Sequence, residues 1–525
     1  MSSLTYIRKG SVDERLYQKN IAAAASSEST LVVLPTGLGK TVIALLVIDN
    51  LLASGSGKIL FMAPTRPLVE QHFSFLKEKL VLPEGDIVMV TGETSPERRN
   101  EFWQQARIYV ATPQVVQNDM MAGICDISRF SLLIFDECHR ARGDYSYVPI
   151  SKKYSDKNPG GLVLGMTASP GSDLSAVEEI CNALAIKHIE VRTEDDPDVE
   201  PYVQDTVLKW VDVELSPELA AIASALRMML AERIEKLKNL QVLPMESQGS
   251  VRDLLQVSRE LSLRLSSGVR NRALFDSMRI QSEAMKIAHA VDMAETQSVY
   301  ALRRFWQKLI SDAGSSSSRA ASFIVNDRNF QAVTTLIDTA RSEHPKVSRL
   351  REIIQQQLRN MPQSRIMVFT QFRDTAEMVQ KNLQEVPGVR PVKLIGQGRR
   401  GEDRGLKQAE QKEVVNEFSS GRANVLISTS VGEEGLDITS TDAVIFYEPV
   451  PSEIRLIQRR GRTGRLRAGK VFVLVTRGTK DEGFYYSSKR KERMMKFSLL
   501  GLNQKLREGS AIIPPTRRQK SLYEF

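Results

Sequence analysis

Short, nearly continuous apolar runs rich in valine and isoleucine recur through the first part of the chain, separated by longer mixed segments. The runs are residues 31–34, 59–62, 87–90, 108–110, 132–135 and 162–164. Strands of a parallel sheet have this pattern because helices cover both faces of the sheet. Their alternation with helical segments predicts a doubly wound α/β domain.

This pattern stops near residue 215 and resumes after residue 348. The later runs are residues 366–369, 392–395, 425–427, 443–446 and 471–475, which predict a second α/β domain. Between the two domains the chain has helical periodicity, beginning at Ser216-Pro217, a capping serine followed by a proline suited to a first helical turn. The apolar stripe after it suits core packing. Its members are Leu219, Ile222, Leu226, Met229, Leu230 and Leu237. Residues 314–318, a glycine and four serines, suit a flexible loop inside this region.

The predicted organisation is therefore α/β, with two parallel-sheet domains and an α-helical insert between them. Its boundaries are 1–205 for the first domain, 215–345 for the insert, 346–507 for the second domain and 508–525 for a flexible tail.

Composition narrows the class of protein only slightly. The 525 residues are 42% hydrophobic and 26% charged, as in a soluble globular protein, and no apolar run approaches the roughly 18 residues that span a bilayer. The first residues have no signal-peptide pattern, and the three cysteines form no CxxC pair, so we expect a soluble intracellular protein. A net charge of +9 permits a polyanionic partner without identifying one.

A phosphate-binding loop is predicted between the first apolar run and the helix after it. Backbone amides of a glycine-rich loop at a helix N-terminus bind anions. Lys40 would reach the β- and γ-phosphates and Thr41 would hold Mg²⁺, although Leu34 stands where the full pattern has a glycine. The predicted loop residues that bind ATP are Thr36, Gly37, Gly39, Lys40 and Thr41.

Asp136 and Glu137 directly follow the apolar run 132–135. An apolar strand that ends in two acids suits an ATPase, in which Asp136 would bind Mg²⁺ and Glu137 would orient and deprotonate water. An exposed acidic turn is the alternative, which the upstream phosphate loop disfavours. Before that loop, Tyr17 and Gln18 suit an adenine-reading motif, with Tyr17 stacking and Gln18 hydrogen bonding to the base.

These motifs together resemble helicase superfamily 2, and the resemblance covers most of the chain. It implies RecA-like domains in which hydroxyls, amides and an arginine at strand ends contact nucleic-acid phosphates without reading bases. Residues 167–169, Thr-Ala-Ser, match the motif that couples hydrolysis to nucleic-acid binding. The implied nucleic-acid contacts are Thr65, Arg66, Thr91, Gly92, Thr112, Thr370, Gln371 and Thr429.

Residues 458–465, Gln-Arg-Arg-Gly-Arg-Thr-Gly-Arg, match the superfamily's most distinctive motif. By resemblance, Arg462 and Arg465 are arginine fingers, Gln458 approaches the γ-phosphate, and Asp437 contacts the ATP ribose or positions the fingers. A generic basic patch is the alternative, and glycines at fixed spacing between the arginines disfavour it.

The Asp-Glu-Cys-His tetrad, the helical insert and the segment 478–493 are similar to the archaeal Hef helicases, relatives of the Fanconi-anaemia M translocase. That resemblance implies an ATP-dependent DNA translocase that remodels stalled forks and Holliday junctions, in the cytoplasm and associated with the nucleoid. A structure-specific nuclease could act in trans, since the XPF-type nuclease signature of Hef proteins is absent from this sequence. The main alternative is a double-stranded-RNA-stimulated ATPase of the Dicer or RNA-sensor type, and a non-catalytic binding module is disfavoured by the complete ATP motifs.

Two further regions suggest partners. The insert carries Arg252, Arg259, Arg264, Arg270, Arg272 and Arg279, which could grip a second DNA arm or simply form a solvated face. At the C-terminus, Gln519, Leu522 and Phe525 resemble the box that binds the sliding clamp PCNA, although the usual pattern ends in two adjacent aromatics. The alternative for this tail is packing on the domain beside it, or fraying.

Overall fold

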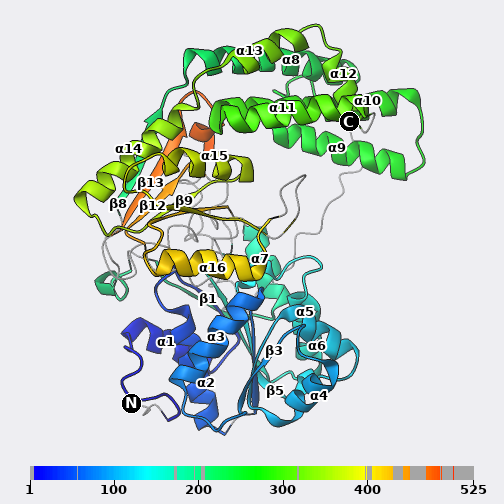
Figure 1. Ribbon diagram of the computed structural model, residues 1–525. Helices are drawn as coiled ribbons and strands as arrows, with labels where there is room; N and C mark the ends of the chain where they lie inside the picture. Colours follow the sequence, from blue (N-terminus) through cyan, green and yellow to red (C-terminus); the bar gives the residue numbers. More distant parts are fainter. Residues whose placement is uncertain are drawn as a thin grey trace.

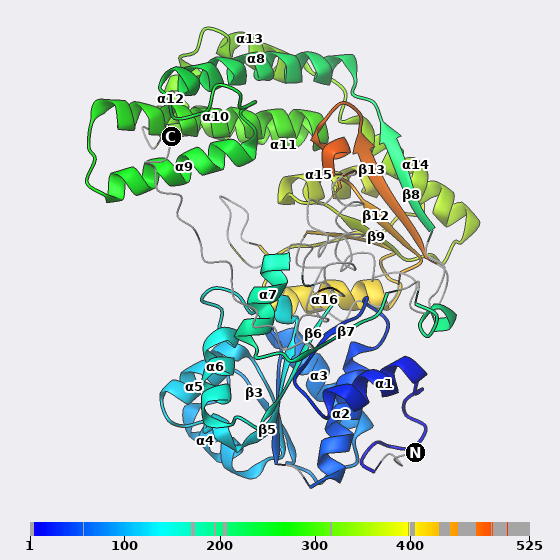
Figure 2. The same ribbon diagram turned by 180° about the vertical axis from the view of Figure 1, so that it is seen from behind.

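The computed structural model describes residues 5–55, 57–168, 170, 174–193, 196–202, 207–315, 318–396, 398, 405–429, 441–449, 469–484, 486 and 501. Figure 1 shows them as three tiers: a first α/β domain, a second α/β domain, and a helical insert that extends from the second domain on the side away from the first. Figure 2 shows the same arrangement from behind. The predicted fold class is confirmed.

The first domain is a seven-stranded sheet with strand order β3-β4-β2-β5-β6-β1-β7, parallel throughout. Its strands are β1 (Thr30–Val33), β2 (Lys58–Met62), β3 (Ile87–Val90), β4 (Ile108–Ala111), β5 (Phe130–Asp136), β6 (Leu162–Thr167) and β7 (His188–Val191). Its helices are α1 (Leu16–Ala25), α2 (Lys40–Ala53), α3 (Arg66–Lys79), α4 (Pro96–Gln105), α5 (Pro113–Met121), α6 (Tyr147–Lys157) and α7 (Leu174–Ala183), with short 3-10 turns at Ile127–Arg129, Cys138–Arg140 and Glu200–Tyr202.

Both faces of this sheet are buried, which explains the continuous apolar strands. In β1, Leu31 and Val33 belong to the core on one face, while Val32 belongs to the core on the other. Helices α1, α2 and α3 supply the second of these cores, and α5, α6 and α7 contribute to the first. Successive strand residues point to opposite faces, so a strand covered on both sides needs apolar residues at every position.

The second domain is a six-stranded parallel sheet with strand order β10-β11-β9-β12-β13-β8. Its strands are β8 (Val207–Val213), β9 (Ile366–Phe369), β10 (Pro391–Leu394), β11 (Val425–Ser428), β12 (Ala443–Phe446) and β13 (Lys470–Thr476). Its longer helices among the described residues are α14 (Pro345–Asn360), α15 (Arg373–Gln384) and α16 (Gln408–Ser419), and residues 480–484 are also helical. All five strands that the sequence predicts here are present.

Strand β8 shows how the insert is connected to the rest of the chain. Residues 207–213 fall between the predicted first domain and the predicted insert, yet they form the edge strand of the second sheet, with Val207 opposite Lys470 and Val213 opposite Thr476. The chain therefore enters the second sheet before it forms the insert, and returns to that sheet through α14. The helical region is therefore an insertion within the second domain, and it does not link the two α/β domains.

The insert consists of α8 (Pro217–Asn239), α9 (Val251–Ser266), α10 (Arg272–Thr296), α11 (Val299–Gly314), α12 (Arg319–Val325) and α13 (Phe330–Thr339). As predicted, Ser216 caps α8: its Oγ accepts a hydrogen bond from the Leu219 amide at 3.3 Å. The apolar stripe of α8 is buried in the insert's core, apart from Leu230, which is only partly buried. Among the described residues no helix is both long and apolar enough to cross a membrane.

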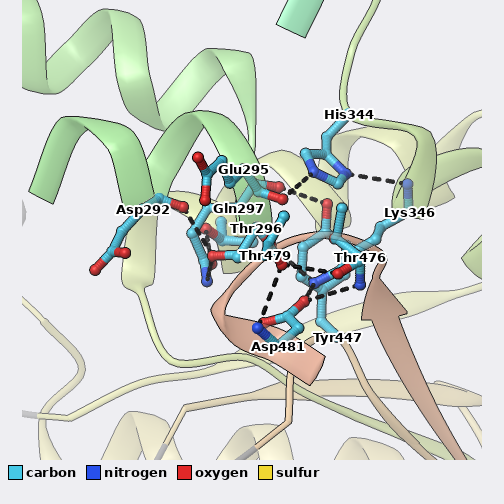
Figure 3. A network of polar contacts seen from close by, with 11 residues as sticks. Asp292, Glu295, Thr296, Gln297, His344, Lys346, Tyr447, Thr476, Thr479 and Asp481 are labelled. Atoms are coloured by element: carbon cyan, nitrogen blue, oxygen red, sulfur yellow. Dashed lines mark hydrogen bonds and ion pairs between the residues drawn. The ribbon is translucent and has the colours of Figure 1, made fainter. Parts of the chain in front are cut away.

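A buried polar network joins the insert to the second domain (Figure 3). Lys346 Nζ, fully buried at the start of α14, donates to Asp481 Oδ2 at 2.6 Å and to the Thr296 carbonyl at 3.0 Å. Tyr447, which follows β12, donates its hydroxyl to the Gln297 carbonyl at 2.7 Å. Because removing one partner of a buried ion pair leaves an uncompensated charge, these contacts stabilise the junction between the insert and the second domain.

Candidate functional site

The strand order of the first sheet separates the predicted ATP residues from the predicted nucleic-acid residues. The phosphate loop follows β1 and the acid pair ends β5, and these strands flank β6 in the order β5-β6-β1. The predicted nucleic-acid segments follow β2, β3 and β4, which are adjacent in the order β3-β4-β2. Since all the strands are parallel, their carboxyl ends lie along one edge of the sheet, with the two groups side by side on it.

The predicted phosphate loop joins β1 to α2, and its two glycines adopt backbone conformations that other residues rarely tolerate. Gly37 and Gly39 have φ angles of +88° and +83°. A Cβ atom at Gly39 would also collide with the side-chain amide of Gln18. Lys40 begins α2, and its Nζ donates to the carbonyl of Leu34 at 3.0 Å. The loop thus presents the first amides of α2, the positive end of the helix dipole, beside a lysine.

Tyr17 and Gln18 stabilise this loop through hydrogen bonds to its backbone. The Tyr17 hydroxyl and Gln18 Nε2 both donate to the carbonyl of Leu38, at 2.6 and 3.1 Å. Tyr17 is fully buried, so its ring offers no open face on which the predicted adenine could stack, because the core of the first domain encloses it. Beside it the Arg15 guanidinium lies 4.8 Å from the centroid of the Tyr202 ring, a pair that sequence patterns did not reveal.

Asp136 is the last residue of β5 and is almost completely buried. Its Oδ2 lies 2.8 Å from Nε2 of His72 on α3, while its backbone carbonyl accepts a hydrogen bond from the Tyr147 hydroxyl at 2.8 Å. His72 was missed by the sequence analysis. The available signal was its position in the buried stripe of α3, between Val69 and Leu76.

Glu137 has a left-handed backbone conformation, with φ of 48°, which is costly for a residue other than glycine. Its Oε2 is buried, has no hydrogen-bond partner among the described residues, and lies 3.2 Å from Nδ1 of His139. The same His139 nitrogen lies 3.2 Å from the hydroxyl of Thr167 at the end of β6. His139 therefore connects the acid pair to the first residue of the Thr-Ala-Ser segment, whose Ser169 lies outside the described residues.

The predicted nucleic-acid residues of the first domain lie where the topology suggests. The Thr65 hydroxyl is buried without a hydrogen-bond partner among the described residues, and Arg66 forms ion pairs with Glu70 and Glu93. Thr112 precedes α5 and its side chain makes no capping bond to that helix. Thr91 is buried, and Gly92 beside it is exposed.

In the second domain, Thr370 and Gln371 follow β9, and Thr429 follows the adjacent strand β11. The Thr370 amide donates to the Ser428 carbonyl at 3.0 Å, so the two segments are hydrogen-bonded neighbours. The Thr370 hydroxyl is buried and unpaired among the described residues, whereas Gln371 is exposed. An unpaired buried hydroxyl therefore occurs among the predicted nucleic-acid contacts of both domains.

Seven predicted residues lie outside the part of the chain that the structure describes. They are Asp437, Gln458, Arg462, Arg465, Gln519, Leu522 and Phe525.

Family models match most of the chain. A DEAD/DEAH box helicase model matches residues 15–177, and a helicase conserved C-terminal domain model matches residues 345–467. Between them, residues 218–344 match a helical bundle provisionally assigned to ATP-dependent RNA helicases.

Individual relatives are similar over nearly the whole chain. A Methanocaldococcus jannaschii protein, provisionally named an ATP-dependent RNA helicase, is 40% identical over 93% of this chain and 61% of its own length. The ATP-dependent DNA helicase fml1 of Schizosaccharomyces pombe is 33% identical over 96% of this chain and 62% of its own. This chain thus spans less than two thirds of the length of these curated relatives.

A solved structure matches more completely. The crystal structure of the Pyrococcus furiosus Hef helicase domain superimposes with a TM-score of 0.70 at 40% sequence identity. The match covers 92% of this chain and 100% of that one. Together with the two helicase domain models and the helical insert between them, this match shows that the chain belongs to the Hef family of superfamily 2 helicases.

Proposed function

We propose that this protein is an ATP-dependent DNA translocase that remodels forked or branched DNA, such as stalled replication forks and Holliday junctions. The observation that carries the proposal is the strand order of the first sheet, in which the predicted ATP residues follow β1 and β5 and the predicted nucleic-acid residues follow β2, β3 and β4. A sheet edge that serves both ligands lets a change at one site alter the other. The name of fml1 as a DNA helicase supports DNA as the substrate.

The proposed chemistry at the ATP site uses the phosphate loop and the acid pair. Lys40 binds the β- and γ-phosphates, and Glu137, held in its strained conformation beside His139, orients and deprotonates the attacking water. The Thr41 hydroxyl and the Asp136 carboxylate are oxygen donors of the kind that Mg²⁺ prefers, and Mg²⁺ would supply charge neutralisation between the phosphates. The His72 contact holds the Asp136 carboxylate in place at the end of β5.

The second domain would complete the site. Arg462 and Arg465 would act as arginine fingers, with Gln458 near the γ-phosphate and Asp437 at the ribose. These residues are remote from Lys40 along the chain, so closure of the second domain on the first would bring them to ATP. Closure and opening around a bound strand would then drive translocation.

The insert is the proposed contact for a second DNA arm. On α9, Arg252 and Arg259 lie on the face opposite the buried Leu254, Val257 and Leu261. Arg264, Arg270 and Arg272 are also exposed. Arg279 is different: it pairs with Glu283 and Asp276 and lies over the Phe323 ring, with 3.9 Å between its guanidinium carbon and the ring centroid. Arg279 therefore belongs to the insert's own packing, and the other five are the candidate phosphate contacts.

The decisive experiment compares ATPase stimulation by forked DNA, linear duplex DNA and duplex RNA. We expect the strongest stimulation with forked DNA. Replacing Arg252, Arg259 and Arg264 by alanine should spare basal turnover, weaken fork binding, and lower the slope of log affinity against log salt by about three, roughly one for each phosphate contact. Arg349→Ala on α14, an exposed arginine of the second domain, is the matched control. Stronger stimulation by duplex RNA than by any DNA would favour the RNA alternative.

A sliding clamp of the PCNA type is a second proposed partner, bound through Gln519, Leu522 and Phe525. An aliphatic and an aromatic side chain three residues apart lie on one side of a single helical turn and suit a hydrophobic pocket. The basic residues Arg517, Arg518 and Lys520 suit an acidic surface around that pocket. A structure-specific nuclease acting in trans is compatible with the same proposal, since remodelled junctions are substrates for cleavage.

A further inference from the structure

Glu70 lies between a predicted nucleic-acid contact and the other α/β domain. On one side, Glu70 Oε1 accepts a hydrogen bond from Nε of Arg66, one turn earlier on α3, at 2.8 Å. On the other, Glu70 Oε2 accepts from Nζ of Lys412 at 2.9 Å, and Lys412 lies on α16 of the second domain. A single carboxylate therefore holds two cations, one from each domain.

Two nitrogens of the Arg66 guanidinium, Nε and Nη1, contact carboxylates in this arrangement. Besides Glu70, Arg66 forms an ion pair with Glu93, which directly follows the predicted nucleic-acid residues Thr91 and Gly92. A phosphate group that binds the Nε edge of Arg66 with two parallel hydrogen bonds must therefore replace the Glu70 carboxylate. Because phosphate oxygens accept two parallel hydrogen bonds from a guanidinium, the phosphate backbone is a suitable competitor for these carboxylates.

The environment of Glu70 keeps its carboxylate charged when no nucleic acid is bound. Its side chain is about one quarter exposed, with 26% of its surface accessible, and the Arg66 side chain is 30% accessible. Burial acts to raise the pKa of Glu70, but hydrogen bonds from Lys412 and Arg66 outweigh it and hold the pKa below its ordinary value. The carboxylate is thus available to Lys412 even when Arg66 turns to another anion.

Helix α3 makes this exchange relevant to hydrolysis. It begins at Arg66, contacts the second domain through Glu70, and places His72 Nε2 2.8 Å from Oδ2 of Asp136. One helix therefore contacts the nucleic-acid site, the interface between the domains and the ATP site. Helix α3 is therefore a direct physical connection between these three places.

We propose that Glu70 is a positioning residue that couples nucleic-acid binding to closure of the two domains, an inference that rests on the proposed DNA-stimulated ATPase. Without nucleic acid, Glu70 divides its carboxylate between Arg66 and Lys412. When a backbone phosphate takes Arg66, the full negative charge of Glu70 is left for Lys412, and the contact between the domains strengthens. Binding of the strand thereby favours the closed state in which ATP is hydrolysed.

Two measurements test this assignment: DNA affinity without nucleotide, by fluorescence anisotropy with a forked oligonucleotide, and ATP turnover with and without saturating fork. Glu70→Gln removes one of the two carboxylates that pair with Arg66, and it weakens the bond to Lys412. It should bind DNA more tightly, by about fivefold at the low end of allosteric couplings, while its DNA-stimulated turnover falls by a similar factor. Lys412→Gln should lose stimulated turnover without any gain in DNA affinity. A purely structural role would not move affinity and turnover in opposite directions.

The double variant Glu70→Lys with Lys412→Glu restores an ion pair between the domains with reversed charges. It should recover stimulated turnover relative to either single reversal and retain tight DNA binding, because no carboxylate at position 70 competes with phosphate for Arg66. Glu413→Lys, a charge reversal at an exposed neighbour on α16, is the control that should match the wild type. The inference is overturned if Glu70→Gln leaves both affinity and stimulated turnover within twofold of the wild type. If DNA does not stimulate the wild-type ATPase at all, the proposed function fails and this inference fails with it.

Discussion

His72 Nε2 lies 2.8 Å from Oδ2 of Asp136, which connects the helix that begins at a predicted nucleic-acid contact to the predicted metal-binding carboxylate. Both side chains are almost completely buried. A buried polar contact of this kind fixes the rotamers of both partners, because an unmatched group would be costly in the protein interior. This contact orients the Asp136 carboxylate at the end of β5, directly before Glu137.

Glu137→Gln should retain ATP binding and lose ATP turnover. The substitution preserves the shape of the side chain and its position beside His139, but an amide cannot accept a proton from water. Lys40→Ala should weaken both binding and turnover, because it removes the charge that contacts the phosphates. Equilibrium binding of a fluorescent ATP analogue and steady-state phosphate release separate the two outcomes. Near wild-type turnover in Glu137→Gln would show that another group is the base.

Arg465→Ala should lower turnover by at least ~10²-fold while leaving ATP affinity unchanged, in keeping with the magnitudes of arginine fingers. The finger stabilises charge that develops only in the transition state, so ground-state binding does not depend on it. Single-turnover hydrolysis and nucleotide titration measure the two quantities on the same preparation. A defect confined to DNA binding would instead identify Arg465 as part of a basic patch.

Simultaneous replacement of Leu522 and Phe525 by alanine should abolish binding to the sliding clamp from the same organism and leave ATP turnover intact. The two side chains would provide the anchor that enters the clamp's pocket, and truncated anchors typically lose a large part of the binding free energy. Isothermal titration of the clamp with wild type and variant provides the comparison. Absence of detectable binding by the wild-type protein would contradict the proposed partner.

Most strands that the sequence predicted are buried on both faces, and the two predicted edge strands, β3 and β10, are partly buried. Strands β1, β2, β5 and β9 are nearly continuous apolar segments, and each lies inside its sheet. The edge strands β7 and β8 escaped prediction because an edge or half-covered strand tolerates polar residues. In β8 Lys209 and Asp212 are exposed, and β7 includes His188 and Glu190. Their pairing depends on partners distant in the chain.

In the candidate site, too, local sequence patterns were predictable and contacts between distant residues were not. Glycine-rich loops and acid pairs are local patterns, so the phosphate loop and Asp136-Glu137 could be located from sequence spacing alone. Contacts such as Glu70 with Lys412 join residues from different domains, and no local pattern indicates which of many surface charges will meet. The burial of Tyr17 was equally hidden, because its motif does not reveal that the core of the first domain encloses the ring.

The junction between the insert and the second domain should weaken as the pH falls below about 6.5, the ordinary pKa of histidine, because His344 is buried there in its neutral form (Figure 3). Its Nδ1 accepts a hydrogen bond from the Lys346 amide at 3.2 Å, and its Nε2 lies 3.1 Å from the Glu295 carbonyl, which can only accept. These partners assign the proton to Nε2. Burial, reinforced by the charge of Lys346, lowers the pKa of His344 to about 3.

A histidine whose folded-state pKa lies below its unfolded value stabilises the fold fully above the unfolded pKa. That contribution is lost as the pH falls from about 6.5 towards the folded value, because the unfolded chain binds the extra proton first. Between pH 7.5 and pH 5 the expected loss is about 2 kcal/mol, from 1.36 kcal/mol for each pKa unit. Hydrogen exchange of the peptides around Thr296 and Gln297 measures the opening of this junction. A local measurement is needed because a chain with several domains need not unfold in a single step.

The variant His344→Asn isolates this group. Asparagine is a favoured residue before a helix and can accept the Lys346 amide as Nδ1 does, but it does not titrate. Protection of the junction in His344→Asn should therefore change less between pH 7.5 and pH 5 than in the wild type. The difference between the two proteins cancels the contributions of the titratable groups that they share. Equal loss of protection in both proteins over this range would show that His344 is not the group whose protonation opens the junction.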